Sequence, residues 1–132
     1  PSSKGVNWLF DKATKKGYSL IMDSNFSEVT IAQNNIKRLL DKEYLIEINY
    51  IYRDLHESYE FAKKRESVTK RHVPMEIVVE RFKSSFDTTL FIKNIFTDSI
   101  ILNLLDRKNN KVHDDIDAEV FFEILSKEIL CP

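Results

Sequence analysis

The stretch Tyr44-Leu-Ile-Glu-Ile-Asn-Tyr-Ile-Tyr52 decides the fold, because its β-branched and aromatic residues predict a strand. A second strand is predicted upstream, over residues 18–22, where almost no polar residue interrupts the run. A third is predicted downstream, over residues 98–105, followed by a small strand return at 111–113. Apolar residues with helical spacing separate these strands. The alternation predicts an α/β fold with a parallel sheet and right-handed crossovers.

Capping residues place the helices between the strands. Ser27 is the predicted N-cap of the helix before the central strand, and Asp54 with Glu57 forms a capping-box pattern after it. Pro74 suits the first turn of a long helix whose apolar face reaches about Phe96. A first helix that stops at Gly17 and a last helix from about residue 117 complete the prediction.

Length and composition predict one α/β domain over residues 1–132. The net charge is −1, which argues against a nucleic-acid module held mainly by phosphate neutralisation. A single cysteine, Cys131, excludes an internal disulfide framework and indicates a cytoplasmic protein. No apolar run is long enough to span a bilayer, so no membrane association is expected.

A cationic segment connects two predicted helices, and five of the nine residues from Lys63 to Arg71 are Lys or Arg. This concentration of one sign indicates an anionic ligand, and the segment could close over the strand ends as a lid. Arg65 and Arg71 are the candidates for phosphate binding, because a guanidinium grips phosphate oxygens bidentately and keeps its charge. The structural alternative is a solvated helix end favoured by the helix dipole.

Polar residues follow each predicted strand, where the ligand of an open parallel sheet binds. Asp23 and Asn25 follow the first strand, Arg53 and Asp54 the second, and Asp106 and Arg107 the third. Asp23 could accept a hydrogen bond from a bound hydroxyl or act as a base. The alternative for Asp23 is a residue that caps a helix or forms a turn.

Other reactive side chains carry weaker signals. The three histidines are isolated, and no His, Cys and Asp cluster has metal-ligand spacing, so no metal site is expected. Cys131 has no histidine companion and is not expected to be a nucleophile.

Several pieces in order resemble the later part of a zeta-toxin-type P-loop kinase, over about residues 6–112. They are Gly17-Tyr-Ser-Leu-Ile-Met-Asp23, Ile36-Lys-Arg-Leu-Leu-Asp-Lys-Glu-Tyr44, Arg65-Glu66, Arg71-His-Val-Pro74 and Phe96-Thr-Asp-Ser-Ile-Ile-Leu102. The resemblance implies a three-layer α/β/α kinase-like fold and ATP-dependent phosphorylation of a UDP-activated amino sugar. It implies that Arg65 and Arg71 contact the ATP phosphates in a catalytic role. It also implies that the loop of Asp23 and Asn25 binds the substrate, and that an antitoxin protein is a partner.

The sequence departs from this family at several points. Ser24-Asn25 stands where the family usually has Gly-Thr, and the two lid arginines are closer together than in the best-known toxins. Gly5 and Gly17 are the only glycines, so residues 1–132 make no G-x-x-x-x-G-K-[ST] loop. We therefore expect the C-terminal portion of such a kinase, inactive alone and without tightly bound ATP and Mg²⁺. We also expect an open strand edge that forms a homodimer.

Three alternatives remain open from the sequence. One is a non-catalytic interaction or regulatory domain, indifferent to Arg65 and Arg71. Another is a nucleic-acid-binding module that uses the patch from Lys63 to Arg71, although the nearby Tyr59 and Phe61 are predicted to be core residues. The last is an unrelated small α/β enzyme with Asp23 and Arg71 as its catalytic pair.

Overall fold

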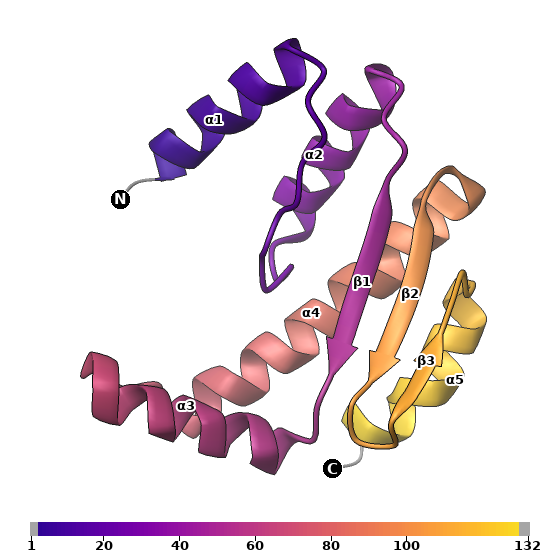
Figure 1. Cartoon of the computed structure of the whole chain (residues 1–132). Coiled ribbons are helices and arrows are strands. Elements are labelled where there is room, and N and C mark those ends of the chain that lie inside the picture. The colour runs from indigo at the N-terminus through magenta and orange to yellow at the C-terminus, as the bar shows by residue number, and fades with distance from the viewer. Residues whose placement is uncertain (1–2, 130–132) are drawn as a thin grey trace.

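A computed structural model describes residues 3–129 of the chain (Figure 1). The described chain has five helices and a small sheet, and a 3-10 turn, Thr97–Ser99, precedes the second strand. The helices are α1 (Ser3–Lys15), α2 (Val29–Asp41), α3 (Leu55–Thr69), α4 (Met75–Phe96) and α5 (Ala118–Ile129). The strands are β1 (Glu47–Tyr52), β2 (Ile101–Asp106) and β3 (Lys111–His113).

The three strands pair in the order β1-β2-β3. β1 and β2 are parallel, with Glu47 opposite Ile101 at one end and Tyr52 opposite Asp106 at the other. α3 and α4 make the crossover between them, whereas β3 returns antiparallel to β2 after a tight turn. The prediction of an α/β fold with parallel strands is therefore confirmed.

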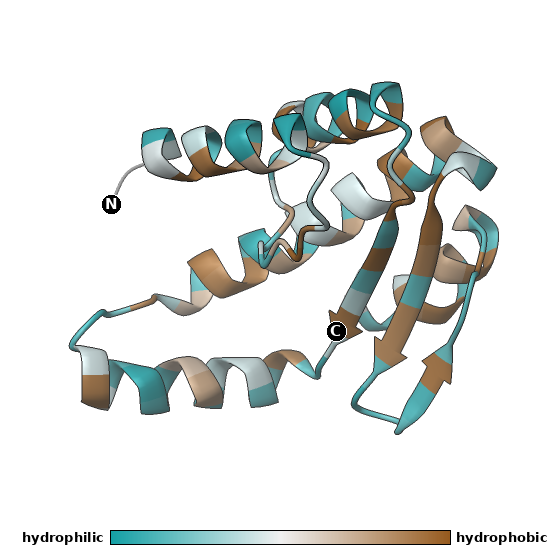
Figure 2. Cartoon of the chain, turned by 45° about the horizontal axis from the view of Figure 1, so that its top comes forward, coloured by the Kyte–Doolittle hydropathy of each residue, from teal (hydrophilic) through white to brown (hydrophobic). Residues whose placement is uncertain are grey.

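Helices α2, α4 and α5 pack on the sheet face that carries the even-numbered residues of β1 and β2. Tyr50, Leu102 and Leu104 form the main core with side chains from α4 and α5, chiefly Phe86 and Phe121. A second cluster joins α2 and α4 to the start of β1 through Ala32, Ile36, Ile46, Ile92 and Ile100. In Figure 2, β2 is mostly hydrophobic, whereas hydrophobic and hydrophilic residues alternate along β1.

The opposite face of the sheet carries polar contacts and exposed residues. Asn103 donates hydrogen bonds to Glu47 Oε1 at 2.6 Å and to Asn49 Oδ1 at 3.0 Å. Ile51 on the same face is 61% exposed. Of the three layers implied by the family resemblance, residues 3–129 thus supply the sheet and one helical layer.

The predicted strand over residues 18–22 is wrong. Among the described residues this stretch has no strand partner, and the Ile21 side chain is fully exposed. The backbone N–H and C=O groups of an extended segment cannot hydrogen-bond to one another within that segment. Residues that favour a strand therefore do not form one without a neighbouring strand. The Tyr44 hydroxyl, in the connection between α2 and β1, donates a hydrogen bond to the Tyr18 carbonyl at 2.7 Å.

Two further predictions about the helices need correction. Glu28, not Ser27, is the N-cap of α2, because the Ser27 hydroxyl is engaged with Asn25. Tyr59 and Phe61 are not core residues: none of the residues of α3 is buried, and Phe61 is 44% exposed. The Arg53 guanidinium covers the Phe61 ring at 4.7 Å instead.

The capping prediction for α3 is confirmed. The Asp54 carboxylate accepts hydrogen bonds from the backbone N–H groups of His56 and Glu57 at 3.0 and 3.5 Å. Within residues 3–129, no helix combines the length and the apolar character needed to cross a membrane.

Candidate functional site

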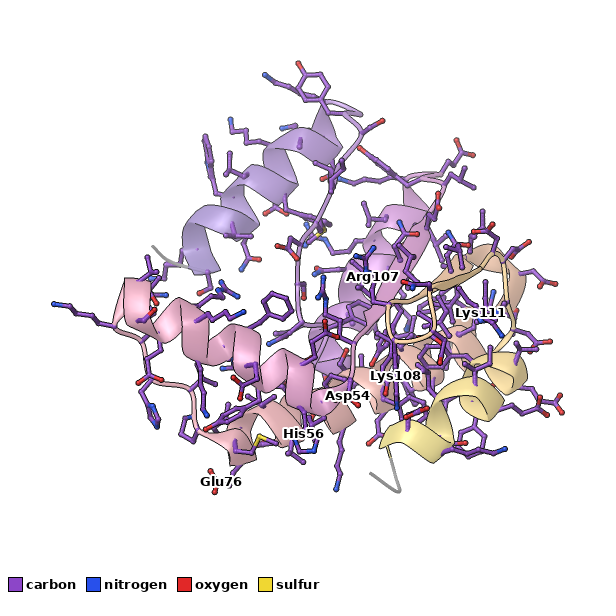
Figure 3. All side chains as sticks on the ribbon, turned by 60° about the horizontal axis from the view of Figure 1, so that its bottom comes forward. Asp54, His56, Glu76, Arg107, Lys108 and Lys111 are labelled. Carbon is purple, nitrogen blue, oxygen red and sulfur yellow. The ribbon has the colours of Figure 1, made fainter. Side chains whose placement is uncertain are left out.

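Polar side chains gather where the parallel strands end, as the open-sheet rule predicts (Figure 3). Asp106 is nearly buried, and its carboxylate holds the turn after β2 by accepting from the backbone and side-chain N–H groups of Asn109. Asp106 is therefore committed to the turn. Arg107 lies on the same turn and is exposed.

Lys108 follows on this turn and lies between two carboxylates. Its Nζ donates to Glu128 Oε2 at 2.7 Å and lies 3.6 Å from Asp54 Oδ2. The hydrogen bond with Glu128 raises the pKa of Lys108. Burial alone would raise the pKa of Asp54, but the N–H groups that it caps and the Lys108 charge hold that pKa below its ordinary value. Both groups are therefore charged at neutral pH.

The loop of Asp23 and Asn25 forms local turns. The Asn25 Oδ1 accepts from the Ser27 backbone N–H at 3.3 Å and from its hydroxyl at 2.9 Å, which is an Asx turn. Phe26 between them has a φ of +53°. Asp23 is exposed, and its carboxylate has no hydrogen bond or ion pair with another residue in the range 3–129.

A cavity of about 290 Å³ lies between this loop and α4. Asn25, Ser27 and Glu28 line it from the loop, and Ile77, Glu80, Arg81 and Ser84 line it from the helix. Arg81 and Ser84 were not singled out from the sequence. Their signal is that Arg81 and Ser84 stand at i+4 and i+7 from Ile77, and so share one face of the helix with it, opposite the apolar stripe.

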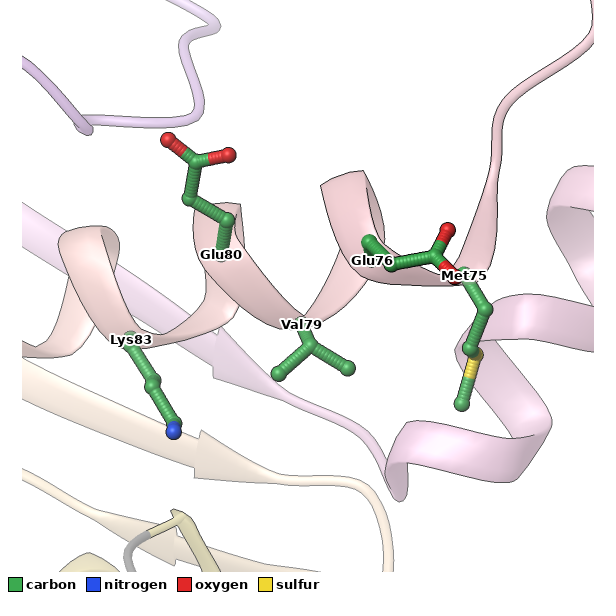
Figure 4. Close-up of a pocket in the computed structure, with 5 residues that line it drawn as sticks. All are labelled: Met75, Glu76, Val79, Glu80 and Lys83. Carbon is green, nitrogen blue, oxygen red and sulfur yellow. The ribbon is translucent and has the colours of Figure 1, made fainter.

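A second hollow of about 460 Å³ lies beside the first half of α4 (Figure 4). Met75 and Val79 supply its apolar lining, and Glu76, Glu80 and Lys83 complete it. Glu80 lines both spaces, so α4 separates a polar cavity from a more apolar one.

Arg65 and Arg71 lie on the helical hairpin formed by α3 and α4. Arg65 is in the last turns of α3, and Arg71 is in the connection after Lys70, which ends the helix with a φ of +56°. Both arginines are exposed, and among residues 3–129 neither guanidinium has an ion pair or a side-chain hydrogen bond. The connection is tied to α3 by His72 Nδ1, which lies 3.0 Å from Glu66 Oε1.

The structure does not bring the predicted site residues into contact. Figures 1 and 2 both show the turn between α3 and α4 at the far end of the hairpin, away from the sheet and from the loop that precedes α2. Asn25 shares its cavity with α4 residues, not with Arg65 or Arg71.

Metal binding finds no support in the described part of the chain. Residues 3–129 contain no group of three or more His, Cys, Asp or Glu side chains that could hold a metal ion. Cys131 lies outside the described residues.

The parallel pair, the helical crossover and the polar strand tips define an α/β protein whose fold is consistent with part of a P-loop-kinase-like domain. The family model described as Zeta toxin matches residues 2–117. The chain therefore belongs to the Zeta toxin family. No curated protein and no solved structure matches it.

Proposed function

We propose that residues 1–132 form a single α/β domain that acts as the lid and substrate side of an ATP-dependent kinase. In this proposal Arg65 and Arg71 close over the ATP phosphates, and Mg²⁺ accompanies the nucleotide. The loop of Asp23 and Asn25 binds the acceptor, a UDP-activated amino sugar or a similar small molecule. Membership in the Zeta toxin family supports this proposal.

The nucleotide part of the proposal rests on a contrast between the two arginines and the two lysines that precede Arg65, Lys63 and Lys64. Lys63 lies over the Tyr59 ring at 4.7 Å and Lys64 over the Phe61 ring at 5.7 Å. The two guanidiniums form no ion pair among residues 3–129 and remain available to an external anion. Phosphate oxygens are the ligands that suit a planar guanidinium best.

The cavity beside Asn25 supports the acceptor part. Its wall combines the Asn25 amide, two serine hydroxyls, the carboxylates of Glu28 and Glu80 and the Arg81 guanidinium. Such a set can donate hydrogen bonds to sugar hydroxyls and accept hydrogen bonds from them. Asp23 lies two residues away in the same loop, so its carboxylate can face an acceptor bound at the mouth of the cavity.

Residues 1–132 contain no phosphate-cradling loop, so we expect them to bind nucleotide weakly and not to transfer a phosphoryl group alone. We propose a cytoplasmic location and an antitoxin protein as the regulatory partner. Mixing the chain with a candidate antitoxin and measuring a stoichiometric complex by calorimetry would test the partner.

Replacing either arginine by alanine is expected to weaken ATP binding about tenfold, because each removes a charge-assisted contact to phosphate. Binding of Mg²⁺·ATP is measured by calorimetric titration of the full chain. Lys64→Ala is the matched control and should leave the affinity unchanged. Unchanged affinity in both Arg65→Ala and Arg71→Ala would overturn the lid assignment. Tighter binding of single-stranded nucleic acid than of ATP, with steep salt dependence, would favour the nucleic-acid alternative.

We also propose that the chain forms a homodimer through the open edge of β1. Ile101 N–H donates to the Ile46 carbonyl at 2.9 Å, so the even-numbered residues of β1 direct their backbone groups toward β2. The odd-numbered residues then direct theirs toward the open edge. Antiparallel pairing centred on Tyr50 places Glu47 of each copy opposite Arg53 of the other copy. The two edges are therefore complementary in charge.

Ile51→Lys is expected to convert the dimer into a monomer, because it adds charge at the edge. The mass is measured by light scattering at micromolar concentration, and Val68→Lys on exposed α3 is the control. Exchanging the charges singly, by Glu47→Arg or Arg53→Glu, should also dissociate the dimer, and combining the two should restore it. A monomeric parent chain at this concentration would refute the edge proposal.

A further inference from the structure

The helix that carries Arg65 has little to hold it in place. None of the residues of α3 is buried, and the helix packs mainly against α4. At its first turns, Arg53 lies 3.5 Å from Glu57 and covers the Phe61 ring. The direction of α3 therefore depends on how its N-terminal end is fixed.

A chain of contacts fixes this end to the core. Tyr52 is only 2% exposed, and its hydroxyl donates to Glu128 Oε2 at 3.3 Å. Burial, together with the nearby Glu128 charge, raises the pKa of Tyr52, so this hydroxyl keeps its proton. Glu128 in turn accepts from Lys108 Nζ at 2.7 Å, and Lys108 pairs with Asp54, the N-cap of α3.

Lys108 is the central link of this chain. It joins a carboxylate on α5 to a carboxylate at the start of α3, and it comes from the turn between β2 and β3. Among residues 3–129 it is the one cation that pairs with both Asp54 and Glu128. Without its charge, two like charges would face each other across this junction, and α3 would lose its tie to α5.

We propose that Lys108 is a positioning residue: it sets the angle at which α3 leaves the sheet, and through α3 the place of Arg65. This inference rests on the proposed function insofar as Arg65 binds nucleotide. The tether itself is a property of the described structure. Side chains from β1, from the N-cap of α3, from α5 and from the turn after β2 meet at Lys108. A single lysine can therefore set the direction of α3, which has no buried residue.

The first test measures hydrogen exchange of the amides in the first turns of α3. Lys108→Met keeps the length of the side chain and removes its charge, so exchange there should become about two- to fivefold faster. Lys108→Arg should restore the parent rate, and Lys111→Met, on the neighbouring strand β3, should leave it unchanged. Exchange in β2 should not change in any variant, because the core is intact. Unchanged exchange of α3 in Lys108→Met, or an equal change in Lys111→Met, would overturn the proposal.

The second test adds Mg²⁺·ATP to the same variants. Lys108→Met should weaken binding about two- to fivefold, and Lys108→Arg should recover it. Faster exchange of α3 without any nucleotide binding in the parent chain would uphold the tether and refute the lid function. Full nucleotide affinity in Lys108→Met, with Arg65→Ala still impaired, would show that the tether does not position Arg65.

Discussion

Phe121→Ala is expected to lower the free energy of unfolding by about 3–5 kcal/mol, the range for removing a fully buried aromatic side chain. Phe121 on α5 is completely buried. Its ring stacks on Phe86 with centroids 5.5 Å apart and meets the edge of Tyr50 at 5.1 Å. It thereby joins α5, α4 and β1, and a small domain has only about 5–15 kcal/mol of stability in total. Urea denaturation followed by circular dichroism measures the loss.

The neighbouring residue provides a matched control for this prediction. Phe122 on the same helix is 43% exposed, and its ring lies 6.2 Å from Phe86 in a tilted arrangement. Phe122→Ala removes the same atoms from a site that water already reaches, so its cost should stay near 1 kcal/mol. Equal losses in the two variants would mean that α5 does not pack as described.

The elements that could be predicted from the sequence are those whose signals lie within the element itself or directly beside it. The β-branched and aromatic run before Tyr52 is a strand, and Asp54 caps the next helix, because both signals are local. Residues 18–22 have the same apolar character but form no strand. A strand requires a neighbouring strand that hydrogen-bonds to its backbone, and the residues of one strand do not show which segment that neighbour is.

The candidate site could be predicted only in part for a similar reason. The sequence places Asn25 in a loop after an apolar run, and this loop does line a cavity. Arg81 and Ser84 on the other wall belong to a helix far along the chain, and only the packing of α4 brings them to the loop. Lys108 likewise stands in an ordinary polar turn, and its role depends on the position of Glu128 near the end of α5. The nucleotide and acceptor roles of Arg65, Arg71 and Asp23 remain predictions.

Lys93 shows how a residue that breaks a sequence pattern can be essential to the fold. It lies seven residues after Phe86 on the apolar side of α4, where a lysine would be unexpected. The side chain is only 5% exposed, and its Nζ donates to the carbonyls of Thr97 and Ile100 at 2.7 and 2.8 Å. These carbonyls belong to the connection in which Thr97 adopts a φ of +44° and the chain turns from α4 into β2. The ammonium therefore adds to the long backbone hydrogen bond of this turn, from the Ile100 N–H to the Thr97 carbonyl at 3.5 Å.

Lys93→Met is expected to lower the free energy of unfolding by about 2–3 kcal/mol, because it leaves the buried Ile100 carbonyl and the partly buried Thr97 carbonyl without their charged donor. Methionine keeps most of the apolar stem of the lysine side chain. The loss of unfolding free energy therefore comes from the hydrogen bonds more than from the packing. Lys83→Met, two to three turns earlier on the exposed side of the same helix, should change stability by less than about 0.5 kcal/mol. Urea denaturation of both variants decides the point. A loss as small as that of Lys83→Met would show that water replaces the ammonium in the turn, and that Lys93 does not hold α4 to β2.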